Sequence, residues 1–186
     1  MTMIMEMLHN DHVEMAKILN AFEREIEREK RGQNADFELI WAILDYFGGY
    51  PALRHHPLED LVYQKLRLMD DFQQFDLLTD LLTEHEELEQ DRLDLTAGVD
   101  NLEEDVEAPR TGFHALAESF LARYRLHMAH EEEELFPEAQ RRLSSQDWAE
   151  IDVQALQRRD SPTGTMFGMR FEKLRSEIAD ATGLAR

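Results

Sequence analysis

One stretch of the chain restricts its structure more than any other. Residues 125–137, RLHMAHEEEELFP, place His127 four residues before Glu131, with no glycine or proline between them. Four residues is about one turn of an α-helix, so both side chains leave the same face. A neutral imidazole and a carboxylate on one face form a natural pair of ligands for iron or manganese. The alternative is that the acidic run from Glu131 to Glu134 is a solvated helix face.

The same arrangement occurs a second time, nearer the N-terminus. An HxxxE pair recurs 72 residues earlier as His55 and Glu59, and two further histidines, His12 and His85, each follow an acidic residue and lie 73 residues apart. The sequence therefore predicts a pair of helices that occurs twice. Each copy would supply one histidine from its first helix and an HxxxE pair from its second. Ligands at equivalent positions would meet near the approximate twofold axis of such a bundle.

The other histidines have no counterpart under this shift, and we interpret them as bystanders to the repeated set. They are His9, His56, His114 and His130.

Four long amphipathic segments carry these motifs. Apolar residues at a spacing of three to four predict helices over residues 4–31, 37–69, 75–104 and 112–143. Short connections between helices of this length predict an all-α fold, an up-down-up-down four-helix bundle.

Local signals mark where these helices should begin, bend and end. Asp36 and Thr111 are expected to cap the second and fourth helices, the latter after an Ala108-Pro109 link. We expect the second helix to bend or split at Gly48, Gly49, Pro51 and Pro57. The end of the fourth helix should kink at Pro137.

The C-terminal part follows a different pattern from the bundle. A short helix should open at Ser144 or Ser145 and run through Leu156, followed by a loop over residues 158–168 and a last helix over about residues 169–181. We interpret this extension as a short helical cap packed on the bundle; the alternative is an independent partner-binding element. The 186 residues would then form a single domain, with a bundle core over about residues 4–143 and an extension over about residues 144–186.

Charge and composition exclude several classes of function. The net charge of -20 repels phosphate backbones and anionic membranes, so nucleic acid and lipid are not expected partners. The chain has no cysteine, which excludes disulfides, iron–sulfur ligation and thiol catalysis. The N-terminal residues do not resemble a secretory signal, and no apolar run is long enough to span a membrane. We therefore expect a cytoplasmic protein, a monomer or dimer whose ligand is a small molecule.

The repeated side chains have the composition of a two-metal site. Four imidazoles with two bridging carboxylates would give each ion two nitrogens and two oxygens, and one bridging oxo or hydroxo group would leave a position open for a small ligand. Two iron ions suit this donor set, with manganese or zinc as alternatives. The plain alternative is a metal-free bundle with surface histidines. The predicted ligands are His12, His55, Glu59, His85, His127 and Glu131.

These motifs resemble those of the hemerythrin-like (HHE cation-binding) family, in the bacterial form that reads His, HxxxE, His, HxxxE. The resemblance covers about residues 4–143 and includes the LFP that follows the last motif. It implies the same helical bundle and a di-iron centre. A ferritin-like site would need two Glu-x-x-His motifs on separate helices, and only Glu6 with His9 matches that pattern.

The chain departs from the oxygen-carrying members of that family at two points. Those proteins are expected to have a fifth imidazole where this chain has Glu89, four residues after His85. Glu89 is therefore an additional candidate, as a metal ligand, as an acceptor for a ligand, or as a solvated carboxylate. The last acidic ligand of the carriers would correspond to Glu132, whereas the repeat favours Glu131. An extra anion at this place would favour Fe(III) and weigh against simple reversible oxygen carriage.

By resemblance, members of the family that are not carriers handle peroxide or nitric oxide, and some release iron for cluster repair. We therefore expect a di-iron oxidoreductase with catalase- or peroxidase-like activity, acting in oxidative or nitrosative stress. The alternative is a module that binds, senses or stores oxygen, nitric oxide or iron without turnover. No catalytic residue is assigned. His56 and His130 are candidates for a proton relay, with a structural role as the alternative.

Overall fold

The computed structural model describes residues 2–69, 72, 75–103, 110–160 and 162–183, and every regular element in these residues is helical. The bundle is formed by α1 (Met3–Lys30), α2 (Phe37–Tyr50), η1 (Pro51–His55), α3 (His56–Arg67), α4 (Phe75–Glu103), α5 (Arg110–His130), η2 (Glu131–Leu135) and α6 (Phe136–Arg142). Here η marks a π-helical turn. The extension adds α7 (Ser145–Asp160) and α8 (Pro162–Thr182).

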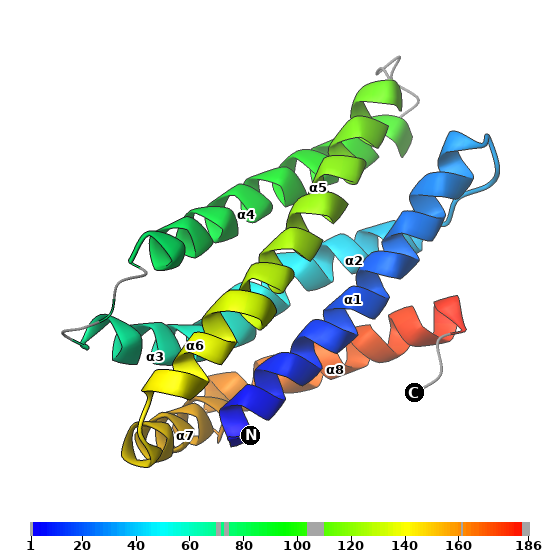
Figure 1. Ribbon diagram of the computed structural model, residues 1–186. Coiled ribbons are helices and arrows are strands. Elements are labelled where there is room, and N and C mark those ends of the chain that lie inside the picture. The colour runs from blue at the N-terminus through cyan, green and yellow to red at the C-terminus, as the bar shows by residue number, and fades with distance from the viewer. Residues whose placement is uncertain (1, 70–71, 73–74, 104–109, 161, 184–186) are drawn as a thin grey trace.

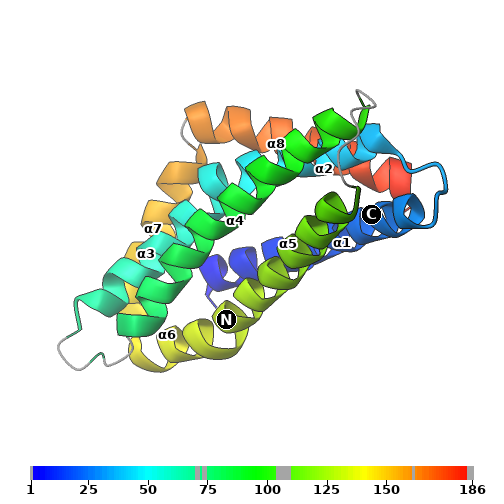
Figure 2. The same cartoon turned by 90° about the horizontal axis from the view of Figure 1, so that it is seen from above.

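The predicted all-α bundle is confirmed. Four long rods form the bundle: α1, then α2 with η1 and α3, then α4, then α5 with η2 and α6. Helix α1 packs against α2 and α5, and α4 packs against the same two helices from the other side (Figures 1 and 2). Successive rods are antiparallel, as in an up-down-up-down bundle. None of the described helices has the length and apolarity needed to cross a membrane.

The helix ends agree with the sequence at one cap and differ at another. Asp36 caps α2 as predicted, because its Oδ1 accepts a hydrogen bond from the backbone N–H of Leu39 at 3.0 Å. Thr111 was the wrong choice for a cap, since α5 already includes Arg110 and Thr111 is inside the helix. The predicted link at Ala108-Pro109 lies outside the described residues.

Two widened turns interrupt the second and fourth rods next to the predicted ligands. Each turn closes on a residue that precedes a proline: the N–H of His56 bonds to the carbonyl of Pro51, and that of Phe136 bonds to the carbonyl of Glu131. The following prolines, at positions 57 and 137, have no N–H to donate and push away the carbonyl four residues earlier. The rods therefore continue past these prolines with one residue more in the turn.

The predicted interruption of the second helix is confirmed at Pro51–His55, but the paired glycines do not cause it, because α2 runs through both of them. Gly49 lies against α8, where an added Cβ would be 2.5 Å from the ring of Phe171. Gly48 lies against α4, where an added Cβ would be 2.8 Å from the guanidinium carbon of Arg92. These glycines therefore permit close contact with neighbouring side chains, and they do not break the helix.

The C-terminal extension is more helical than predicted. The expected loop over residues 158–168 is wrong, because α7 runs to Asp160 and α8 begins at Pro162, so the cap is two full helices. Proline suits the first turn of a helix, where its missing N–H would have no partner. Helix α8 lies along α2 and α7 lies against α3 and α1 (Figure 2), with Trp148 and Phe171 among the buried anchors.

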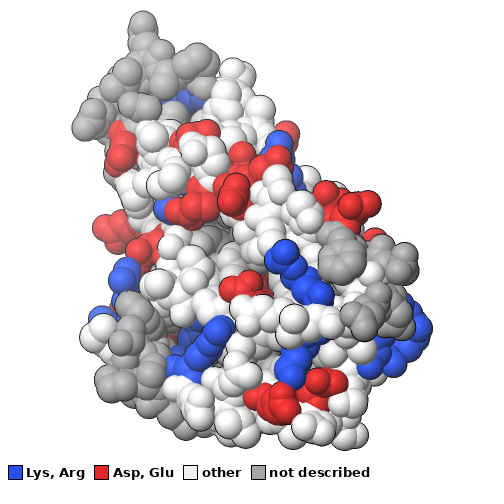
Figure 3. Space-filling model, turned by 90° about the vertical axis from the view of Figure 1, so that its left-hand side faces the viewer, with Lys and Arg blue, Asp and Glu red and all other residues white. Residues whose placement is uncertain are grey.

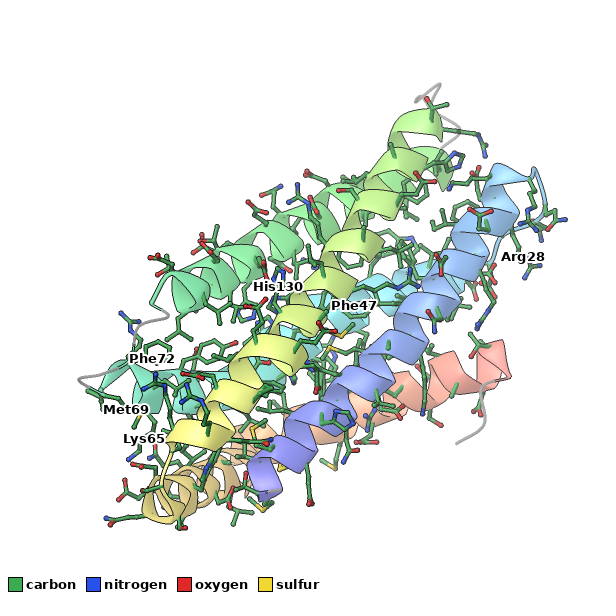
Figure 4. All side chains as sticks on the ribbon, viewed as in Figure 1. Arg28, Phe47, Lys65, Met69, Phe72 and His130 are labelled. Atoms are coloured by element: carbon green, nitrogen blue, oxygen red, sulfur yellow. The ribbon has the colours of Figure 1, made fainter. Side chains whose placement is uncertain are left out.

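The apolar core is divided into two clusters. One includes Phe22, Phe47 and Phe120, and the other includes Leu8, Leu58 and the aromatic ring of Phe72. In Figure 4, Phe47 is labelled near the middle of the bundle and Phe72 toward its left end. The predicted ligands lie between the two clusters, so the apolar core surrounds a polar centre.

The surface shown in Figure 3 carries acidic side chains with arginine and lysine among them. The negative charge of the chain therefore does not form one continuous patch on this face.

Candidate metal centre

Six side chains from the four rods meet in the middle of the bundle. His12 comes from α1, His55 from η1, Glu59 from α3, His85 from α4, His127 from α5 and Glu131 from η2. Both carboxylates are completely buried, and the most accessible imidazole, that of His85, has a side chain only 12% exposed. The structure thus brings together all six residues of the repeated set, whose role as metal ligands stays a prediction.

The four imidazoles form two pairs that follow the sequence repeat. The Nε2 atoms of His12 and His55 lie 3.0 Å apart, and those of His85 and His127 lie 3.1 Å apart. Metal–nitrogen bonds of about 2.1 Å that meet at a right angle place their nitrogens about 3 Å apart. The two nitrogens of each pair are therefore close enough to bind a single ion.

The two carboxylates lie between these pairs. Glu59 has one oxygen, Oε1, 2.8 Å from Nε2 of His55 and the other, Oε2, 3.7 Å from Nε2 of His85. Oε2 of Glu131 is 3.2 Å from Nε2 of His12 and 3.5 Å from Nε2 of His127. Each carboxylate thus faces both pairs, which is the position of a bridging ligand between two ions.

The buried charge of the centre fits a bound cation. Both oxygens of Glu59 and Oε2 of Glu131 are buried, and their close contacts are with imidazole nitrogens, at 2.8 Å for His55 and 3.2 Å for His12. Burying two carboxylates is costly unless positive charge lies beside them, which protonated imidazoles or metal ions would supply. Three buried oxygens and two pairs of imidazole nitrogens therefore match the donor set that imidazole- and carboxylate-binding metals prefer.

The buried carboxylates raise the pKa values of two of the imidazoles. Burial by itself would lower the pKa of His12, but Glu131, Glu132 and Glu59 outweigh that effect and raise it to about 11. Burial likewise acts to lower the pKa of His55, and Glu59 and Asp11 raise it to about 9. In the metal-free chain these carboxylates therefore hold protons on the imidazoles, in the place where a metal would supply positive charge.

Three of the four imidazoles are oriented by a carboxylate on their other nitrogen. Nδ1 of His12 lies 2.8 Å from Glu132, Nδ1 of His55 lies 3.2 Å from Asp11, and Nδ1 of His127 lies 2.8 Å from Glu84. Such contacts fix the ring and direct Nε2 inward, as is usual for histidines that bind metals.

Sequence reasoning missed the role of these carboxylates, although it contained a signal for two of them. Asp11 and Glu84 are the acidic residues directly before His12 and His85, so the repeat extends beyond the predicted ligands. Asp11 contacts His55 and Glu84 contacts His127, so each carboxylate contacts the histidine of the HxxxE pair in its own copy of the repeat.

His85 is the exception among the four. None of the described carboxylates accepts a hydrogen bond from its Nδ1, and its ring instead stacks on that of His56, with centroids 3.6 Å apart and planes 12° apart. Burial first, and then the neighbouring His85, lower the pKa of His56 well below its usual value. His56 thus packs against the second pair, with ligand atoms of His56, His85 and His127 within 4.8 Å of one another, whereas His55 contacts Glu59 at 2.8 Å.

Tyr63 is a further residue that the sequence did not reveal. Its hydroxyl donates a hydrogen bond of 2.6 Å to Oε1 of Glu131 and so holds this carboxylate from the α3 side. Tyr63 lies four residues after Glu59 on the same helix face, and that spacing is the signal that could have identified it.

The remaining candidates lie outside the group of six. Glu89 pairs with Arg92: its two oxygens accept from the guanidinium at 2.7 Å each, and its side chain is 47% exposed. Arg92 offsets its charge, so the expectation of an added anion at the metals is not supported by this geometry. His130 contacts Glu84 at 3.0 Å, whereas His114 pairs with Glu29.

The comparisons with known proteins agree with this arrangement. The family model described as the hemerythrin HHE cation-binding domain matches residues 3–139, a range that contains all six side chains. A search of curated proteins found no match to the chain, and neither did a search of solved structures.

Proposed function

Since the chain belongs to the hemerythrin HHE cation-binding family, we propose that its centre holds two iron ions and consumes a small oxidant or diatomic molecule. Membership of the family implies metal binding, and the His/Glu group could hold the metal. The number of ions, their identity and the reaction are our proposal. The observation that carries it is the pair of buried carboxylates, each facing two imidazole pairs.

In this proposal one ion is held by His12 and His55 and the other by His85 and His127. Glu59 and Glu131 contribute one carboxylate each between them. A pair of iron ions supplies two electrons and a Lewis-acidic position at which a small ligand binds. Imidazole and carboxylate donors suit iron, with manganese or zinc as alternatives.

The protein's own residues orient the centre and exclude water from it. Tyr63 keeps a proton on its oxygen, because burial first, and then Glu59 and Glu131, raise its pKa well above the usual value. The hydroxyl can therefore continue to donate to Glu131. The apolar clusters on both sides of the centre limit its contact with water, which strengthens the electrostatic contacts inside it.

The charges around the centre favour oxidised metal. Five carboxylates would face neutral imidazole rings once metal is bound. Two are the central ones, of Glu59 and Glu131, and three contact the Nδ1 atoms, those of Asp11, Glu84 and Glu132. Excess negative charge stabilises Fe(III) relative to Fe(II). This supports consumption of hydrogen peroxide or nitric oxide, as a defence against oxidative or nitrosative stress, over reversible carriage of oxygen.

A second candidate, sensing without turnover, is favoured by one contact. Helix α8 packs on α2 and η1, so a change at His55 could be passed to the C-terminal extension. Gly168 of α8 lies against Arg54, the residue directly before His55; an added Cβ there would be 2.9 Å from the guanidinium.

Turnover separates the two candidates. Iron-loaded protein should consume hydrogen peroxide or nitric oxide faster than an equal amount of free iron, and a Glu59→Gln variant should lose this activity together with part of its metal. Protein that keeps its iron, binds nitric oxide and consumes neither molecule would overturn the enzymatic proposal in favour of sensing or storage.

A further inference from the structure

Tyr50 is joined to the metal centre through a single carboxylate. Its hydroxyl donates a hydrogen bond of 2.6 Å to Oδ1 of Asp11, and Oδ2 of Asp11 lies 3.2 Å from Nδ1 of the predicted ligand His55. We infer that Tyr50 is a one-electron donor to the metals, used when hydrogen peroxide reaches a centre that is only half reduced. This inference rests on the proposed function, because it concerns the reaction of the same centre.

The electron count of the reaction shows why such a donor is needed. Hydrogen peroxide takes up two electrons and two protons to form two water molecules. A centre with one Fe(II) and one Fe(III) supplies a single electron, and reduction of peroxide by one electron releases a hydroxyl radical. In the step that we infer, Fe(II) gives one electron and becomes Fe(III), and Tyr50 gives the second electron together with its phenolic proton. Solvent supplies the other proton, so the products are two water molecules, Fe(III) and a tyrosyl radical.

The proton of Tyr50 has an acceptor in place. Burial first, and then the charge of Asp11, raise the pKa of Tyr50 above its usual value, so the phenol is protonated at neutral pH. Loss of the electron alone would leave a positive charge on a buried ring, which is unfavourable. The hydrogen bond to Asp11 lets the proton leave at the same moment. The side chain of Asp11 is 14% exposed and can pass that proton to water.

The other tyrosines beside the centre lack such an acceptor. The hydroxyl of Tyr63 donates to Glu131, but Glu131 is itself a predicted ligand, so a metal would occupy the lone pairs that a departing proton needs. The hydroxyl of Tyr124 has a methionine sulfur at 3.9 Å, and a thioether is a weak acceptor. Tyr50 is therefore the tyrosine whose proton can leave without disturbing a predicted metal ligand.

Tyr46 extends this arrangement away from the metals. Its ring stacks on that of Tyr50, with centroids 5.1 Å apart and planes 11° apart. The hydroxyl of Tyr46 is buried and forms no hydrogen bond with the described residues, a costly condition that a phenylalanine at this position would avoid. Phe171 of α8 packs edge-on against both rings. The two stacked phenols can share the missing electron, and α8 shields them from solvent.

Tyr50→Phe tests this inference, and Tyr124→Phe is the matched control. Both changes remove one hydroxyl from a buried tyrosine, and the ring of Tyr124 lies 6.3 Å from that of His127. Iron-loaded, half-reduced protein is mixed with one equivalent of hydrogen peroxide, frozen and measured by electron paramagnetic resonance. The parent and Tyr124→Phe should show a tyrosyl radical signal that ring-deuterated tyrosine narrows. Tyr50→Phe should lose this signal.

Two further measurements use the same proteins at equal metal content. A spin trap should detect more hydroxyl radical from Tyr50→Phe than from the parent, because the second electron is then missing. Asp11→Asn keeps an oxygen that can accept from Tyr50 but removes the base, so it should also lose the tyrosyl radical. It serves as the second variant if Tyr50→Phe does not fold.

A last measurement does not require metal. The metal-free protein is oxidised by flash photolysis with a soluble ruthenium photosensitiser and an electron acceptor, and the yield of tyrosyl radical is followed by its absorbance. The yield should fall in Tyr50→Phe and stay at the parent value in Tyr124→Phe.

The results separate this inference from the proposed function. A radical signal that is equal in the parent and Tyr50→Phe would overturn the inference while the metal centre stands. Peroxide consumption by the half-reduced parent without a tyrosyl radical would do the same. A parent that takes up no metal would overturn the proposed function, and the photolysis yields would still decide whether Tyr50 is the tyrosine that gives up an electron.

Discussion

The two metal positions should differ in affinity because their outer contacts differ. The His12–His55 pair has two carboxylates on its Nδ1 atoms, from Glu132 and Asp11. The His85–His127 pair has one, from Glu84. We therefore expect the first pair to hold its ion more tightly, and we expect Asp11→Asn to reduce the difference.

The magnitude follows from the number of contacts. Losing one outer partner of a ligating histidine typically lowers metal affinity by about 10–100-fold. One carboxylate more at the first position therefore predicts a difference of about 1.4–2.7 kcal/mol between the two binding steps. Asp11→Asn keeps the size of the side chain and an oxygen that can accept from Tyr50, which now donates to Asp11 at 2.6 Å. It removes the charge opposite His55, and the two steps should then nearly coincide.

The assay is an anaerobic titration of metal-free protein with Fe(II) in competition with a chelator. The parent should show two steps and Asp11→Asn should show nearly one. Asp45→Asn is the control, because Asp45 is an exposed aspartate that pairs with Arg170 at the surface. Two equal steps in the parent, or an unchanged difference in Asp11→Asn, would refute the reasoning about outer carboxylates.

Three further outcomes are expected. His55→Ala should lose bound metal, measured by mass spectrometry of the elements, whereas His56→Ala should keep most of it; the opposite order would move the ligand to position 56. Metal uptake at pH 7 should release protons, because the pKa of His12 is raised to about 11 in the metal-free chain and only the neutral ring binds metal. Metal affinity should therefore increase with pH. Calorimetry in buffers of different ionisation enthalpy measures the proton release, and metal uptake without it would contradict this expectation. Gly49→Ala should destabilise the fold by about 1–3 kcal/mol in thermal unfolding, because its Cβ would lie 2.5 Å from a buried phenylalanine ring. Gly112→Ala, with nothing within 4 Å, is the matched control and should be neutral or stabilising, so equal effects of the two would refute the packing argument.

The sequence predicted the bundle and the grouping of the six side chains because both depend on local spacing. A four-residue interval places a histidine and a glutamate on one helix face whatever surrounds them. The repeat then relates the two halves, which explains why His12 and His85 could be singled out from the other histidines. The family match over residues 3–139 agrees with that prediction.

What the sequence did not reveal depends on contacts between distant segments. Gly49 and Gly168 were interpreted as signs of a break and a loop, but both lie in helices where a neighbouring side chain takes the space of the missing Cβ. Glu89 was considered as a ligand from its position after His85, and only the folded chain shows that Arg92 pairs with it. The stacking of His56 on His85 likewise requires α3 and α4 to be placed first.

The central claim is that Glu59 and Glu131 hold two metal ions between the four imidazoles. The most direct measurement is the metal content of protein purified after expression in iron-supplemented medium, together with its optical spectrum. The account predicts about two iron ions per chain, with near-ultraviolet charge-transfer absorption in the oxidised protein, and a clear loss of iron in Glu59→Gln. Protein that folds normally and contains almost no metal, or that keeps its full metal content without Glu59, would contradict it.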